Sequence, residues 1–211
     1  MIDKRTLEQI IADQQEELEI RRSERLCHRP EEAMININSP QAQVVVGVRR
    51  SGKSTLCFMA LENASVKYAY ADFDDERLAD IQATDLNTLL EVLYKIYGDF
   101  QYLFLDEVQN VEGWHLFVNR LLRKRIHVIV TGSNAKLLSS DLATHLSGRS
   151  KEIPLYPFSF LEYCMTKGID TSLTNDYIVV VKGRPVLDQV IENPDKYNET
   201  EDRTPEITLE K

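Results

Sequence analysis

The sequence predicts a three-layer α/β fold, in which a mostly parallel five-stranded sheet lies between helices on both faces. Three observations support this prediction. Short, apolar, β-branched segments recur along the chain, segments with helical periodicity lie between them, and three of the apolar segments end in glycine or polar residues. Strands that alternate with helices form βαβ units, whose ligand sites lie beyond the carboxyl ends of the strands. The length of 211 residues suits one domain, or one and a fraction, with a sizeable core.

The individual elements follow from this pattern. A highly charged segment over residues 6–26 has a narrow apolar stripe, which predicts a helix that lies solvated against the core; a partner-binding helix is the alternative. Strands are expected over residues 42–46, 66–71, 101–105, 126–130 and 151–155. One helix is expected to begin with residues 54–62, and others are expected over residues 85–97, 114–125, 136–146 and 158–167. Residues from 193 onward are polar and acidic, which is typical of a mobile tail.

We divide the chain into an N-terminal helical segment over residues 1–34, a core over 35–165, and a short, partly disordered C-terminal extension over 166–211. The net charge of −9 is unfavourable for binding a polyanion, so a nucleic-acid partner is not expected. No apolar run approaches membrane-spanning length, so no membrane association is expected. The three cysteines are widely spaced, as free thiols in a reducing compartment would be, and we expect a cytoplasmic protein.

Residues 47–54 match the phosphate-loop pattern G-x-x-x-x-G-K-[ST] and lie between a predicted strand and a predicted helix. Gly47 and Gly52 allow backbone conformations and close approaches that a Cβ atom would prevent. Lys53 is expected to reach the β- and γ-phosphates, and the Ser54 hydroxyl to ligate Mg²⁺. The expected nucleotide-binding residues are Gly47, Arg50, Ser51, Gly52, Lys53, Ser54 and Thr55. An ordinary glycine-containing turn with a surface lysine is the alternative interpretation.

The third predicted strand runs directly into two carboxylates, Asp106 and Glu107, which is typical of a Walker B element. We expect Asp106 to hold Mg²⁺ beside Ser54, directly or through water. We expect Glu107 to orient or polarise the water that attacks the γ-phosphate. Acidic residues also cap strands and helices in many proteins, so this assignment depends on the loop upstream. The acidic run over residues 72–76 is interpreted as a solvated turn, with a position near the metal as the alternative.

Two further positions are candidates for the reaction. The fourth predicted strand ends in Thr131, Gly132, Ser133 and Asn134, and a polar side chain there, taken as Ser133, can contact the γ-phosphate or the attacking water. Thr131 and Asn134 remain alternatives, and a helix cap is the structural interpretation. Arg149 follows about one helix later and is expected near the phosphate edge, where it could act as an arginine finger in cis or in trans; a plain surface arginine is equally compatible with the sequence.

Five separated motifs occur in a fixed order, and together they resemble one family. They are the phosphate loop (47–54), Phe-Asp-Asp-Glu-Arg (73–77), Leu-Asp-Glu-Val-Gln-Asn-Val-Glu-Gly-Trp (105–114), Thr-Gly-Ser-Asn (131–134) and Leu-Ser-Gly-Arg (146–149). In this order they resemble prokaryotic AAA-type ATPases of the AAA_14 group, which are often paired with a C-terminal DUF4143 domain. The resemblance covers roughly residues 35–163. It implies a P-loop core with sheet order 5-1-4-3-2 that uses ATP and Mg²⁺.

The sequence departs from this family at its C-terminus, because members usually continue into another large domain and this sequence ends at Lys211. A natural short variant and a truncated chain are both compatible with that ending. Any function of the second domain is therefore not carried over.

The function expected from these residues is Mg²⁺-dependent ATP hydrolysis that couples nucleotide state to a partner. ATP and ADP are the expected ligands, and a homo-oligomer and an unidentified protein are the possible partners. A nucleotide-binding switch with little turnover is the alternative. A small-molecule kinase is less favoured because no arginine-rich lid follows the loop. A GTPase is less favoured because the nearest match to [NT]-K-x-D, at residues 166–169, has the wrong fourth residue.

Overall fold

The computed structural model describes residues 2–24, 26–133, 146, 148–167, 178–181 and 207–210. Two compact units share these residues, Met1–Pro157 and Phe158–Lys211, and each is considered by itself. The helix predicted over residues 136–146 falls almost entirely outside the described residues, as does Asn134.

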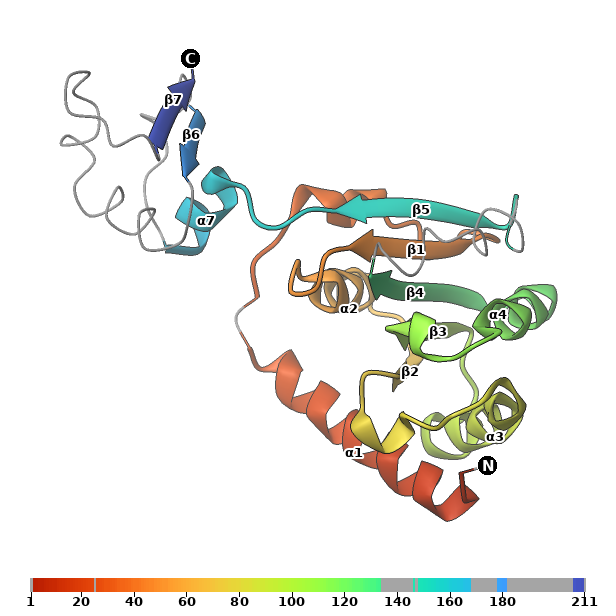
Figure 1. The fold of residues 1–211 in the computed structure, drawn as a ribbon. Coiled ribbons are helices and arrows are strands. Elements are labelled where there is room, and N and C mark those ends of the chain that lie inside the picture. The colour runs from red at the N-terminus through yellow and green to blue at the C-terminus, as the bar shows by residue number, and fades with distance from the viewer. Residues whose placement is uncertain are drawn as a thin grey trace. The chain divides into compact units, whose positions relative to one another are not determined.

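The first unit is built on a single five-stranded sheet (Figure 1). Its strands are β1 (Ala42–Gly47), β2 (Tyr68–Asp72), β3 (Tyr102–Asp106), β4 (His127–Ser133) and β5 (Ser150–Leu155). All pairings are parallel and the spatial order is β2-β3-β4-β1-β5, which confirms the predicted order 5-1-4-3-2. Because every strand runs the same way, all carboxyl ends lie at one edge of the sheet. The register places Gly47 beside Ser133 and Asp72 beside Asp106 at that edge.

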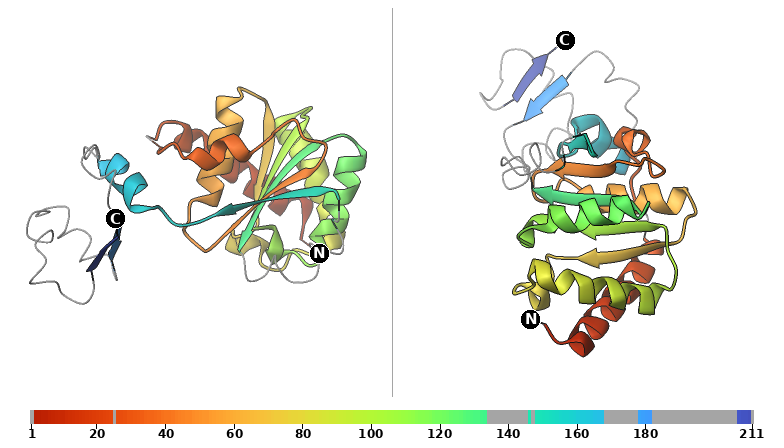
Figure 2. Two further views of the ribbon diagram at one scale, coloured as in Figure 1. Left: turned by 90° about the horizontal axis from the view of Figure 1, so that it is seen from above. Right: turned by 90° about the vertical axis from the view of Figure 1, so that its right-hand side faces the viewer.

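Helices cover both faces of the sheet (Figure 2). The helices of this unit are α1 (Lys4–Arg22), α2 (Lys53–Asn63), α3 (Leu86–Tyr97) and α4 (Trp114–Arg123), and short 3₁₀ turns occupy Pro30–Met34, Glu76–Leu78, Ala83–Asp85 and Val108–Asn110. Helix α3 ends at Gly98, whose φ of 68° suits glycine, as the sequence predicts. Helix α4 ends two residues before the predicted boundary, because Arg125 has a φ of 61° and cannot continue the helix. Within the described part of the chain, no helix has the length and apolar character needed to cross a bilayer.

The strict alternation of side chains along the strands divides the core into two layers. Val44 and Val46 of β1 pack in one cluster with α3 and α4, whereas Val45 packs in the other cluster with α2. Strand β3 alternates in the same way, since Leu103 and Leu105 belong to the first cluster and Phe104 to the second. A parallel sheet buried on both faces needs apolar residues at consecutive positions, which explains the unbroken apolar strands of this sequence.

Helix α1 lies against the core, as expected, next to the edge strand β2 and helix α3. Its buried stripe begins with Leu7, Ile10 and Ile11 in the first cluster and continues to Leu18 in the second. Between these apolar positions, the Gln14 side chain forms two hydrogen bonds with the backbone of Asp72. Its Nε2 donates to the Asp72 carbonyl at 3.0 Å, and its Oε1 accepts from the Asp72 N–H at 3.0 Å. Gln14 thus satisfies the same backbone groups that a neighbouring strand would pair with.

The second unit contains helix α7 (Phe160–Lys167) and an antiparallel pair formed by β6 (Ile178–Val181) and β7 (Ile207–Glu210). The helix matches the segment predicted over residues 158–167. No strand was predicted after residue 193, but Ile207–Glu210 pairs with Ile178–Val181. The reason is local, because Ile-Thr-Leu is a short run with high β-propensity inside an otherwise polar segment.

Two isoleucines of α1 give a matched test of how firmly this helix is docked. Ile11 is fully buried, whereas Ile20 is 66% exposed. We expect Ile11→Ala to lower the free energy of unfolding by about 2–5 kcal/mol through lost burial and a residual cavity. Ile20→Ala should change it by no more than about 0.5 kcal/mol. Urea unfolding monitored by circular dichroism measures both, and equally small losses would show that α1 is not part of the folded core.

Candidate active site

The loop between β1 and α2 has the geometry of an anion site. A Cβ atom on Gly47 would lie 2.2 Å from the carbonyl oxygen of Leu155, so the close packing of β1 on β5 requires glycine there. Gly52 has a φ of 92° and begins α2 without any side-chain cap. The first N–H groups of a helix have no intrahelical partners and carry the positive end of the helix dipole. The start of α2 is therefore open to a negatively charged group.

Lys53 is held inside the loop that it follows. Its Nζ donates to the Val48 carbonyl at 3.3 Å and lies 3.1 Å from Oε1 of Glu107. The side chains of Lys53 and Glu107 are only 3% and 18% exposed, so this ion pair is largely removed from water. Nearby, Oγ of Ser51 is buried and has no hydrogen-bond partner among the described residues. A buried polar atom without a partner fits a site that completes its hydrogen bonds with a ligand.

A residue from the N-terminal segment supports the loop from behind. Arg29 is buried, and its Nη1 donates to the carbonyls of Ser51 and Tyr156, each at 3.0 Å. The guanidinium therefore joins the phosphate loop to the segment that follows β5. This support was not predicted, because the sequence shows Arg29 only as a charged residue before a proline.

Asp106 ends β3 in a buried, hydrogen-bonded position. Its carboxylate accepts hydrogen bonds from the hydroxyls of Thr131 and Tyr70, the latter at 3.4 Å. Burial raises the pKa of Asp106, and the Thr131 and Ser54 hydroxyls oppose that rise. The cost of desolvating this carboxylate is what a bound cation would relieve.

Glu107 adopts a left-handed backbone conformation, with a φ of 50°, which is uncommon for a residue with a side chain. Its N–H donates to Oγ1 of Thr131 at 3.0 Å, and its Oε2 accepts from Nε2 of Gln109 at 2.6 Å. Together with the Lys53 ion pair, these contacts fix both the backbone and the carboxylate. Strained backbone held by several contacts is typical of functional positions.

The structure distinguishes two of the three candidates at the end of β4. Thr131 is fully buried, and its hydroxyl joins the Asp106 carboxylate to the Glu107 backbone. Ser133 lies beside Gly47 in the sheet register, at the mouth of the phosphate loop. Thr131 therefore organises the acidic pair, whereas Ser133 borders the loop.

Arg149 does not lie near the phosphate edge, so that prediction is wrong. Its carbonyl accepts a hydrogen bond from the N–H of Ala42, at the start of β1, and its Nη1 donates to Asn119 at 3.2 Å. The prediction failed because Arg149 precedes β5, and a parallel strand begins at the edge opposite its carboxyl end. From this position Arg149 does not reach a nucleotide bound at the phosphate loop of its own chain. Only the prediction of a contact with a neighbouring subunit is compatible with it.

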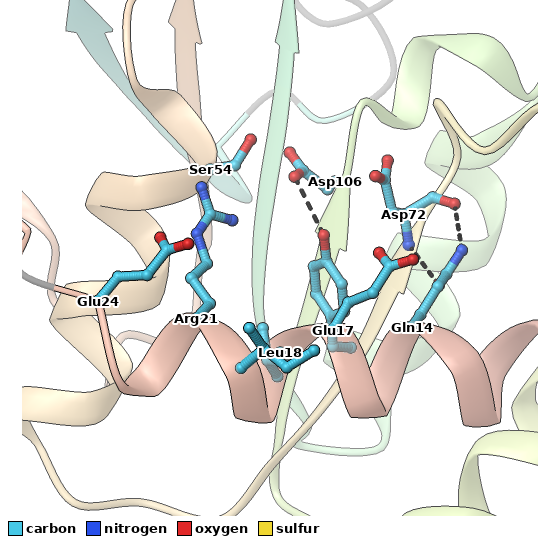
Figure 3. A pocket seen from close by; sticks show the side chains of 10 residues that line it. Gln14, Glu17, Leu18, Arg21, Glu24, Ser54, Asp72 and Asp106 are labelled. Carbon is cyan, nitrogen blue, oxygen red and sulfur yellow. Dashed lines mark hydrogen bonds between the residues drawn. The ribbon is translucent and has the colours of Figure 1, made fainter.

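A pocket of about 380 Å³ opens beside Asp106, between α1 and the carboxyl ends of the strands (Figure 3). Helix α1 contributes Gln14, Glu17, Leu18 and Arg21 to it, among others, and these face Ser54, Asp72 and Asp106. Tyr70 also lines the pocket. The α1 side of this pocket was not predicted. A signal for it exists, since the apolar stripe of α1 continues at helical spacing through two polar residues, Gln14 and Arg21.

Asp74 and Glu76 are exposed, as a solvated turn predicts, but Asp72 lines this pocket, which corrects the preferred interpretation for that residue. It lies beside Asp106 in the register of β2 and β3. Burial, together with the charge of Asp106, raises the pKa of Asp72 to about 7. Asp75 is also committed to a contact, because its carboxylate accepts from Arg77 and from Gln14. The alternative interpretation is the one that this geometry favours for Asp72, because that residue lies near Asp106, the expected metal ligand.

Of the remaining residues in and after the phosphate loop, Thr55 forms a hydrogen bond within the protein, whereas Arg49 and Arg50 are exposed to solvent. Thr55 accepts a hydrogen bond at its Oγ1 from Nη2 of Arg21, at 2.8 Å. Arg50 is exposed and has a φ of 67°. Arg49 pairs with Asp74 at 3.1 Å, but both side chains are exposed, and such pairs contribute little to stability.

The residues present fit a nucleotide with Mg²⁺. The open helix start, Lys53 and the unpartnered Ser51 hydroxyl fit phosphate oxygens, and the oxygens of Ser54 and Asp106 suit a hard cation. Among the described residues, no group of three or more His, Cys, Asp or Glu side chains could hold a metal ion. Mg²⁺ commonly uses one or two protein ligands and completes its shell with water and phosphate. These residues therefore suit Mg²⁺ that arrives with a nucleotide.

The raised pKa of Asp72 gives a test of the unliganded site. A carboxyl group whose pKa is raised in the folded state destabilises the protein as the pH rises. For Asp72 this loss of stability occurs between pH 3.8, its usual pKa, and about pH 7, its pKa in the folded protein. We therefore expect Asp72→Asn to become progressively more stable than wild type over that interval, with a constant difference above it. Melting temperatures from pH 4 to pH 8.5 measure this, with the exposed Asp80→Asn as the control. A difference that does not change with pH would contradict the described environment of Asp72.

Comparison with known proteins agrees with this geometry. A family model described as an AAA domain matches residues 39–164. An uncharacterized protein of Methanocaldococcus jannaschii is 36% identical over 172 residues, which cover 81% of this chain and 38% of that protein. An uncharacterized protein of Haemophilus influenzae is 38% identical over 137 residues, which cover 61% of this chain and 34% of that protein. This chain thus spans little more than a third of the length of these relatives. The match over most of its folded core shows that the chain belongs to the AAA domain family of P-loop ATPases.

Proposed function

We propose that this protein binds ATP with Mg²⁺ and hydrolyses its terminal phosphoanhydride bond. The observation that carries the proposal is the buried contact between Lys53 and Glu107 at 3.1 Å, beside an uncapped helix start. That contact brings a phosphate-binding cation and a candidate base for water to the same point. Asp106 adds a buried carboxylate next to Ser54, which suits a cation.

Each residue has a separate task in this reaction. The loop N–H groups and Lys53 would hold the phosphates and stabilise the charge that develops on them. Ser54 and Asp106 would hold Mg²⁺, which neutralises phosphate charge when it is bound. Glu107 would accept a proton from the attacking water, and Thr131 would keep its backbone in place.

Ligand binding and activation are linked by the same contact. Lys53 engages Glu107 at 3.1 Å, and a carboxylate paired in this way is a weaker base toward water. A phosphate group with a higher charge competes for Lys53, and Glu107 is then released toward the water. Binding would therefore produce the active arrangement of the carboxylate.

The contact between Lys53 and Glu107 also favours a second candidate function, a nucleotide-binding switch with little turnover. Glu107 is held by Gln109 as well as by Lys53, and both contacts oppose its use as a base. Binding titrations beside phosphate release separate the two functions. Tight binding of MgATP without release would favour the switch.

Coupling to a partner is part of the proposal. A neighbouring copy is one candidate, because Arg149 is exposed at the edge of the sheet away from its own phosphate loop. In a homo-oligomer it could approach the nucleotide of the adjacent subunit and stabilise charge on the transferring group.

We expect Lys53→Ala to weaken MgATP binding by about 10–100-fold or more, because it removes a buried, charge-assisted contact to phosphate. Isothermal titration calorimetry measures the affinity. Lys95→Ala is the matched control, because Lys95 pairs with Glu8 at the surface. The Lys95→Ala variant should bind MgATP with the affinity of wild type. Equal affinities of Lys53→Ala and wild type would refute the phosphate-binding role.

We expect Glu107→Gln to keep its affinity for MgATP and to lose turnover by about 10²–10⁴-fold, the usual effect of removing a positioned general base. The amide has nearly the same shape as the carboxylate but does not accept a proton from water. Steady-state phosphate release measures turnover, and the exposed Glu91→Gln serves as the control. Undiminished release from Glu107→Gln would assign Glu107 a structural role only.

A further inference from the structure

Helix α1 carries an arginine into the pocket beside the phosphate loop. The Arg21 side chain extends from α1 toward Ser54, and its Nη2 donates to Oγ1 of Thr55 at 2.8 Å (Figure 3). Its guanidinium also lies 5.7 Å from the ring centroid of Phe58, a buried residue of α2. Thr55 belongs to the first turn of α2, whose N–H groups face the anion site. Arg21 is therefore directed at the phosphate-binding end of this helix.

The charges around Arg21 restrict what the pocket could hold. Its acidic lining residues are Glu17, Glu24, Asp72 and Asp106, and Arg21 is the only lysine or arginine that lines it among the described residues. None of the ion pairs within the described residues involves Arg21. Arg21 and Asp106 nevertheless line the same pocket. The cation and the carboxylate thus share a pocket without touching.

A ligand that fits between two such groups has a negative part near Arg21 and a positive part near Asp106. A polyphosphate chelated to a divalent cation has both parts. We propose that Arg21 binds a phosphate oxygen of the nucleotide, on the side where Ser54 and Asp106 hold Mg²⁺. This inference rests on the proposed function and adds a nucleotide-binding residue from outside the segment matched to the AAA domain, residues 39–164.

The surroundings of Arg21 suit this role. Leu18, one turn earlier, is buried in the core, and Gln14, one turn before that, is hydrogen-bonded to the Asp72 backbone. Helix α1 is therefore held in place by the core and by strand β2, which limits the positions that the guanidinium of Arg21 can reach. An arginine fork also matches phosphate geometry better than an ammonium group does.

The experiment measures MgATP binding by isothermal titration calorimetry in the Glu107→Gln background, so that turnover does not interfere. We expect Arg21→Ala to raise Kd by about 10–100-fold, as loss of a hydrogen bond between charged groups does. Arg21→Lys should recover part of the affinity. Arg22→Ala is the matched control, because Arg22 is the next residue on α1 but pairs with Glu19 and Glu62. It should bind MgATP with unchanged affinity.

Several outcomes would overturn the inference. Unchanged or tighter MgATP binding by Arg21→Ala would show that Arg21 only fills the site in the absence of the ligand. An equal loss in Arg22→Ala would point to a general effect of α1. If Arg21→Ala lacks the wild-type circular dichroism spectrum, Arg21→Gln, which keeps most of the side-chain length, is read in its place. Failure of the Glu107→Gln protein and of wild type to bind MgATP would instead overturn the proposed function itself.

Discussion

Parallel pairing of β1 between β4 and β5 is the constraint on which the rest of the structure depends. Together with the parallel pairing of β3 on β4, it makes the phosphate loop and the Asp106-Glu107 carboxylates leave the sheet at the same end of the strands. It also brings the β1 backbone so close to β5 that only glycine fits at position 47. The tight turn after β1 then opens the start of α2 toward solvent. The chemistry of the site follows from strand direction and from one close backbone contact.

Much of the fold could be predicted, because its signals are local. Consecutive apolar residues indicate buried parallel strands, and the loop motif identifies the first of them. The positions of Lys53 and Asp106 at the carboxyl ends of the strands were predictable because each belongs to one motif, whereas their roles stay predictions. The surroundings of Thr131, Asp72 and Arg21 could not be predicted, because each of these residues contacts a strand or helix that is distant in the sequence. Arg149 was misplaced because its distance along the sequence was read as closeness in space, whereas the strand direction sends it to the opposite edge.

Burial decides how the charged groups of the site behave. Asp72 and Asp106 are adjacent carboxylates that are largely removed from water, so their ionised forms are disfavoured. Lys53 and Glu107 neutralise one another instead, and neither is paired with a group outside the site by an ion pair among the described residues. The site therefore combines disfavoured carboxylate charge at Asp72 and Asp106 with a satisfied ion pair between Lys53 and Glu107. This asymmetry favours a ligand that brings positive and negative charge together.

The two outer strands of the sheet, β2 and β5, differ in what prevents them from pairing with strands of other molecules. Strand β5 carries Lys151, Glu152 and Pro154, and charges and proline on an edge strand discourage further strand pairing. Strand β2, Tyr-Ala-Tyr-Ala-Asp, has no such residue before Asp72 and relies on α1, with Gln14 occupying its last backbone groups. Displacing α1 would expose an apolar edge that can accept a strand from another molecule. The N-terminal helix therefore also guards the fold against edge-to-edge aggregation.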